Sequence, residues 1–230
     1  DFTRSPFIRI IPMRKLLLFL PTLLLTFNSF SQVVLPLKER VSAIEDIQKD
    51  RLENLLPKLM KREKIDCWVI ITREYNEDPI IKSLLPPTWL NARRRTILVF
   101  TLNESSNKVD MAAITRYSFG NLIKSVWDKE KEPNQMKALV DYLSLKNPKN
   151  IGINMSKTYG IADGLSVTDH NLLVSYLPST LKSKVVSSEP LAVSWIETRT
   201  QKEMILFSHL TEITHNIIKR AFSTDVITPG

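Results

Sequence analysis

Two charged stretches, each beside an apolar run, hold most of the side chains that could do chemistry. TREYNEDP at 72–79 follows the apolar run CWVIIT, and NARRR at 91–95 precedes the apolar run TILVF. Loops at the ends of strands often carry functional residues, and arginines bind carboxylates through paired hydrogen bonds. The candidates for an active-site rim or a subunit interface are Glu74, Tyr75, Asn76, Glu77, Asp78, Arg93, Arg94 and Arg95.

Both stretches also have a structural interpretation. The first could be a solvated turn that ends at Pro79, and the arginines could pair with the acidic loop in an exposed ion-pair network. Exposed pairs of this kind contribute little to stability. Spacing alone therefore assigns none of these residues a catalytic role.

Metal and nucleophile chemistry finds little support in the sequence. His209, Glu212 and His215 follow one another at three-residue steps, so on a helix they spread over about 9 Å, too far apart for one metal ion. A polar helix face explains them better. The chain has no GxSxG or HExxH motif and five glycines. Its single cysteine, Cys67, is typical of a small buried hydrophobe.

The elements that position these residues alternate between helix and strand. Apolar spacing predicts a helix over 40–64 that is kinked or restarted at Pro57, because proline removes a backbone donor. Residues 67–72 are predicted to form a strand. Residues 96–102 and 109–115 are predicted to form a hairpin around the polar loop 103–108. Pro133 and Asn134 are expected to open a helix that runs through Leu145, and a strand is expected over 150–155. A helix capped by Thr168 is expected to run to about Leu177, and a strand to cover 184–188. This order predicts an α/β fold, a mixed β-sheet flanked by helices.

The last helix carries a capping box. Thr200 and Glu203 are spaced so that each side chain accepts a hydrogen bond from the other's backbone N–H. An apolar stripe follows, made of Leu206, Leu210, Ile213, Ile217 and Ala221. Such a stripe needs a partner surface. We expect a domain boundary near Glu189 and Pro190, and a further domain after this helix.

The N-terminal residues are typical of an exported protein. Met13 is followed by two basic residues, a 12-residue apolar run and small residues at Ser29 and Ser31. This pattern predicts a signal peptide over 13–31, cleaved before Gln32, and a periplasmic or secreted bacterial protein. The alternative is a retained anchor, but the run is short for a bilayer, which needs about 20 residues. Residues 1–12 are interpreted as not belonging to the natural protein.

Composition narrows the class of protein. Hydrophobic content of 43% and charged content of 24% are ordinary for a globular domain. The net charge is +8, to which the leader contributes four basic residues against Asp1. No nucleic-acid recognition motif accompanies the remaining charge, so we expect no nucleic-acid partner, and no stable membrane span once the leader is removed.

Taken in order, several segments carry a resemblance to a known family. They are KLMKREKIDCWVIITREYNEDPIIKSLLPPTWLNARRRTILVF, GINMSKTYGIADGLS, SSEPLAVSWIETRTQKEM and THNIIKRAFSTDVITPG. The chain from Leu37 to Gly230 resembles the N-terminal half of secreted bacterial pita-bread metallopeptidases, the Xaa-Pro aminopeptidase and prolidase family. The resemblance implies a creatinase-like N-terminal domain over 32–190, and at 191–230 the start of a truncated catalytic domain, with the last helix as its first element.

The resemblance also implies a function. In that family two divalent metal ions (Mn, Co or Zn) hydrolyse peptide substrates, and all five metal ligands lie beyond residue 230. We therefore expect no catalytic residue and no metal ligand in this chain, no metal bound to it and no activity of its own, although its parent would be a hydrolase. The resemblance further implies a homodimer, with the candidate rim near the partner's active site. The alternative is a binding or oligomerisation module, or a pseudoenzyme of the same fold.

Overall fold

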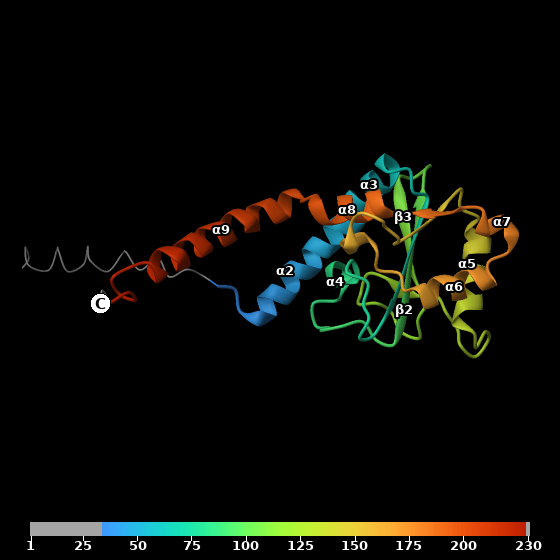
Figure 1. Ribbon diagram of the computed structural model, residues 1–230, viewed down its shortest axis with the longest axis horizontal. Coiled ribbons are helices and arrows are strands. Elements are labelled where there is room, and N and C mark those ends of the chain that lie inside the picture. The colour runs from blue at the N-terminus through green and yellow to red at the C-terminus, as the bar shows by residue number, and fades with distance from the viewer. Residues whose placement is uncertain (1–33, 229–230) are drawn as a thin grey trace, which may run out of the picture. The chain divides into compact units, whose positions relative to one another are not determined.

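The computed structural model describes residues 34–228; the expected signal peptide and upstream segment lie outside this range. From Pro36 onward the described residues form one compact unit. At its centre is a sheet in the order β4-β3-β2-β1-β5-β6. β1 is antiparallel to β2 and β2 to β3, whereas the β3–β4, β1–β5 and β5–β6 pairs are parallel. The mixed sheet flanked by helices is confirmed (Figure 1).

The strands follow the apolar runs. β1 spans Cys67–Arg73, β2 Arg95–Asn103, β3 Lys108–Ala113 and β5 Ile151–Ile153. β6 spans Val185–Ser187, and the short β4, Lys124–Ser125, was not expected from the sequence. The hairpin around residues 103–108 is confirmed, with β1 paired to β2 over its whole length.

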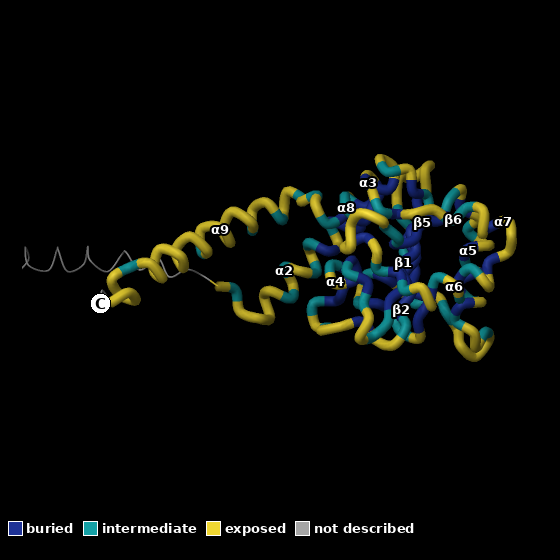
Figure 2. Tube along the Cα trace, viewed as in Figure 1, coloured by how far each residue is buried: buried dark blue, intermediate teal, exposed yellow. Residues whose placement is uncertain are grey.

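Two hydrophobic cores lie on opposite faces of the sheet, because successive side chains of a strand point to opposite sides. Trp68 and Ile70 of β1 pack into one core with α3 (Leu56–Arg62), α4 (Ile81–Leu84) and α8 (Glu189–Glu197). Val69 and Ile71 pack into the other core with α5 (Gln135–Lys146), α6 (Val167–Tyr176) and α7 (Ser179–Lys182). Figure 2 shows the buried chain concentrated at the strands between these helices.

The first predicted helix is interrupted before its proline. α2 spans Leu37–Asp50, a π-helical turn, η2, spans Arg51–Leu55, and α3 resumes at Leu56 with Pro57 in its first turn. Proline is tolerated there because the first N–H groups of a helix have no intrahelical acceptor. The expected restart is confirmed: a π-helical turn separates α2 from α3.

Side-chain caps decide where α5 and α6 begin. Asn134 caps α5 as predicted, accepting hydrogen bonds from the N–H groups of Met136 and Lys137. The prediction that Thr168 caps α6 is wrong: Ser166 accepts from the Asp169 N–H, so the cap lies two residues earlier than predicted. Both residue types cap helices, and sequence alone did not separate the two sites.

The two last helices differ sharply in burial. α8 begins at the boundary expected near Glu189 and Pro190, yet its residues Leu191, Ala192 and Trp195 are buried in the core on one face of the sheet. α9 spans Gln201–Ala221 with the predicted capping box, and none of its residues is buried. Its predicted apolar stripe is thus exposed or half-exposed, with Leu210 at 59% and Ile217 at 62% exposure. Within residues 34–228 no helix combines the length and apolarity that a bilayer span requires.

Candidate functional site

The structure brings the two charged stretches together at one end of the β1–β2 pair. Arg73 ends β1 and is in register with Arg95, which begins β2. Beyond this pair, the Glu74 N–H donates to the Arg94 carbonyl at 2.6 Å, and the Arg94 N–H donates to Glu74 Oε2 at 3.1 Å. A reciprocal pair of hydrogen bonds therefore joins the two predicted loops.

The loop tips have unusual backbone conformations. Tyr75 has φ of 67° and Arg94 has φ of 49°, a left-handed region that residues other than glycine seldom occupy. Tyr75 is also 89% exposed. Strained residues of this kind gather at binding and active sites when their surroundings hold them in place. Asn76, whose N–H donates to the Arg73 carbonyl at 3.0 Å, and Glu77 complete this turn.

Arg73 and Arg95 converge on a carboxylate that the sequence analysis missed. Arg73 Nε lies 2.7 Å and Arg95 Nε 3.2 Å from oxygens of Asp169, whose side chain is 2% exposed. Asp169 also accepts from the Ser166 hydroxyl at 2.9 Å. The hydrogen bond to Asp169 raises the pKa of Arg73 above its ordinary value. Two cations on one buried carboxylate fix α6 against the end of the β1–β2 pair.

The other two arginines have separate environments. The Arg93 guanidinium carbon lies 4.6 Å from the ring centre of Trp89 and 5.7 Å from that of Tyr117, within reach of a cation–π interaction. Arg94 contacts the acidic loop through its backbone. Within the described part of the chain, no side-chain ion pair joins Arg93, Arg94 or Arg95 to residues 74–78. The alternative of an ion-pair network between the two stretches is thus not what the structure shows.

Asp78 lies inside the protein rather than on its rim. It is 0% exposed, and its two carboxylate oxygens accept from the Ile80 N–H at 2.9 Å and from Asn154 Nδ2 at 2.8 Å. Asn154 Oδ1 in turn accepts from Trp68 Nε1 and from the Ser188 hydroxyl. Burial is the main cause that raises the pKa of Asp78, against the hydrogen bonds that lower it. This network joins four segments of the chain inside the protein and is structural.

A second candidate site lies where the chain leaves the parallel strands β5 and β6. The helix after β5, α6, packs on one face of the sheet, and the helix after β6, α8, packs on the other. Open α/β sheets form a ligand crevice where successive connections take opposite faces in this way. A cavity of about 820 Å³ lies here. Its lining residues are Met155, Ser156, Lys157, Thr158, Asp163, Leu165, Val167, His170, Ser187, Glu189 and Pro190.

Hydrogen bonds fix the polar wall of this cavity. The Ser156 N–H donates to Asp163 Oδ1 at 3.0 Å, and the Ser156 hydroxyl donates to Glu189 Oε2. Ser156 Oγ also accepts from the N–H groups of Thr158 and Tyr159. The polar run after strand 150–155 is the only local signal of this site in the sequence, and it did not predict a crevice.

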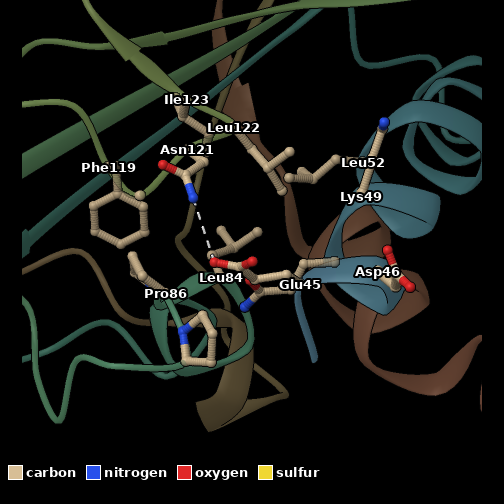
Figure 3. Close-up of a pocket in the computed structure, with 13 residues that line it drawn as sticks. Glu45, Asp46, Lys49, Leu52, Leu84, Pro86, Phe119, Asn121, Leu122 and Ile123 are labelled. Atoms are coloured by element: carbon tan, nitrogen blue, oxygen red, sulfur yellow. Dashed lines mark hydrogen bonds between the residues drawn. The ribbon is translucent and has the colours of Figure 1, made fainter. Parts of the chain in front are cut away.

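A smaller hollow of about 160 Å³ lies between α2 and the loop 119–123 (Figure 3). Asn121 Nδ2 donates to Glu45 Oε1 at 3.4 Å across its mouth. Phe119, Leu52 and Leu84 form its apolar side. This hydrogen bond engages two of the polar side chains that line the hollow, and its volume is much smaller than that of the crevice.

Neither site shows the ligand set of a metal centre. Among residues 34–228 no three His, Cys, Asp or Glu side chains are grouped as metal ligands. His209 and His215 lie on the exposed helix α9.

Comparisons of the chain with protein-family models, with curated proteins and with solved structures find no match.

Proposed function

We propose that this chain is the N-terminal part of a secreted bacterial two-metal peptidase of the Xaa-Pro aminopeptidase and prolidase type. The α/β unit would be its creatinase-like domain, and α9 the first helix of its pita-bread domain. The ordered motifs of the sequence support the proposal, and the mixed sheet flanked by helices is compatible with it. The single observation that carries it is α9, a capped helix of 21 residues without one buried side chain.

In this proposal the described domain supports chemistry that another domain performs. Two divalent metal ions, Mn, Co or Zn, would activate a bridging water and stabilise the oxyanion that forms when it attacks the peptide carbonyl. The family's five ligands lie after the segment that α9 matches. This chain would position the catalytic domain and contribute no ligand.

The exposed loops suggest where this domain meets a second subunit. Tyr75, Arg93 and Arg94 are exposed at the end of the β1–β2 pair, and tyrosine and arginine are enriched among residues that dominate binding energy at interfaces. The reciprocal Glu74–Arg94 hydrogen bonds join the backbones of the two loops that carry these side chains. We assign them to the subunit interface of a homodimer, at the rim of the partner's active site.

Hydrolysis of Xaa-Pro peptides by the complete gene product tests the proposal. We expect turnover that requires added Mn²⁺, Co²⁺ or Zn²⁺ and stops with a chelator, and no turnover by residues 32–230 alone. Metal-dependent turnover by residues 32–230 would show that the active site is misplaced. A complete protein that forms dimers but does not hydrolyse peptides would support the alternative, a binding module or pseudoenzyme.

A further inference from the structure

The crevice at the ends of β5 and β6 has no part in the proposed peptidase chemistry, yet it has the position and size of a ligand site. Its volume of about 820 Å³ falls in the range of about 300–1,000 Å³ that small-molecule sites occupy. The loop 154–166, which forms part of the crevice, also packs closely on the buried side chain of Asp78. A Cβ on Gly164 would lie 2.2 Å from Asp78 Cγ, so only glycine lets the loop pass this close to the buried carboxylate.

One wall of the crevice carries two carboxylates, those of Asp163 and Glu189. Asp163 and Glu189 are both hydrogen-bonded to Ser156 through one oxygen each. Asp163 Oδ2 and Glu189 Oε1 have no hydrogen-bond partner among residues 34–228. Both carboxylates are thus hydrogen-bonded to Ser156, and each has a second carboxylate oxygen that can accept a further hydrogen bond. An ammonium group, which offers three donors, matches this pair of acceptors.

The rest of the lining supplies an opposite charge and an apolar surface. Lys157 is exposed next to Ser156 and forms no ion pair within the described residues. Met155, Leu165, Val167 and Pro190 provide apolar contact. A ligand that matches this lining carries an ammonium group, a carboxylate and an apolar side chain.

We propose that the crevice binds a free amino acid or short peptide with an apolar side chain and both termini unblocked. Asp163 and Glu189 hold its ammonium group, Lys157 its carboxylate, and the apolar lining its side chain. This site is separate from the peptidase centre of the proposed function and does not depend on it.

NMR titration of the full chain with L-leucyl-L-leucine tests the site. We expect shifts confined to residues 155–170 and 187–190 with a Kd of about 1 mM or tighter, which corresponds to about −4 kcal/mol. The N-acetylated and the C-amidated dipeptides should each bind at least tenfold more weakly. Equal binding of free and blocked dipeptides, or no shifts at 20 mM probe, would overturn the proposal.

Isosteric variants separate binding from folding. Asp163→Asn and Glu189→Gln keep an acceptor for Ser156 but lose the charge, so each should weaken binding at least fivefold with unchanged unfolding. Lys157→Met should weaken binding of the free dipeptide but not of the amidated one. Asp141→Asn, an exposed residue of α5, is the control that should bind normally. If the crevice variants bind as tightly as this control, the carboxylates do not hold the ligand.

Discussion

Arg51 and Glu203 form a nearly enclosed ion pair, at 2.8 Å, between the π-helical turn and the first turn of α9. The Arg51 side chain is 7% exposed, and it also donates to the Thr198 carbonyl at 2.8 Å and to the Trp195 carbonyl. Its guanidinium lies 4.3 Å from the Trp195 ring centre. Since Glu203 also accepts from the Thr200 N–H in the capping box, one arginine fixes both the end of α8 and the start of α9.

Arg51→Gln should release α9 while leaving the sheet folded. Removing one member of a buried ion pair costs about 3–5 kcal/mol, and α9 without it has few contacts to hold its direction. In hydrogen exchange, the amides of residues 201–206 should lose their protection, and those of β1 should keep theirs. Arg62→Gln, which removes the exposed pair with Glu63, is the matched control. Protection of α9 that survives Arg51→Gln would show that other contacts hold the helix.

Ile217→Ala should barely change the stability of this chain. Ile217 is 62% exposed, and exposed substitutions usually change the unfolding free energy by about 0.5 kcal/mol or less. Leu173→Ala, at a position with 0% exposure, should cost about 2–5 kcal/mol. Denaturant unfolding of both variants measures the contrast. A loss of 2 kcal/mol from Ile217→Ala would mean that the α9 face is covered in solution, for example by a second copy.

The sequence predicted the elements far better than it predicted their partners. Cys67 to Thr72 reads as a buried strand because its apolar run is continuous, and Thr200 with Glu203 reads as a helix start because their spacing is local. The Arg73–Asp169 contact joins residues 96 apart. No periodic pattern encodes such a pair, so an acidic residue in the first turn of α6 was not recognised as the partner of a strand end.

Besides contacts between distant residues, the sequence did not predict which polar residues are buried. Asp78 sits in an acidic, polar stretch that is typical of a solvated turn, yet Asn154, 76 residues away, makes its burial possible by donating a hydrogen bond. The crevice also depends on α6 and α8 packing on opposite faces of the sheet after the neighbouring strands β5 and β6. The order of helices and strands along the chain does not predict the face on which each helix packs.

Asp169→Asn should destabilise the domain by about 2–3 kcal/mol, because it leaves Arg73 and Arg95 half-buried beside a neutral partner. The backbone N–H of residue 169 still donates to Ser166 Oγ in this variant, so the helix cap should survive. The asparagine oxygen can also still accept from the Ser166 hydroxyl. Thermal unfolding at low and high salt measures the effect. Asp110→Asn, which loses a more exposed pair with Lys146, should cost less than about 1 kcal/mol. Equal losses in the two variants would contradict the assigned role.

The buried carboxylate of Asp78 should give the domain a distinct dependence on pH. Its pKa in the folded protein is raised, chiefly by burial, above the value of about 3.9 in an unfolded chain. The neutral form is therefore favoured by folding, and this contribution is fully present below about pH 4 and is lost as the pH rises through the folded pKa.

Asp78→Asn tests this sign. The variant should be less stable at pH 4 by about 1–3 kcal/mol, because its NH2 group would face a donor in either orientation, the Ile80 N–H or Asn154 Nδ2. Between pH 4 and pH 7 the wild-type protein should lose stability relative to the variant, so the difference between their unfolding free energies should shrink. Glu104→Gln is the control, since a hydrogen bond from Lys149 lowers the pKa of Glu104 and its effect has the opposite sign. A wild-type advantage that grows from pH 4 to pH 7 would mean that hydrogen bonding outweighs burial at Asp78.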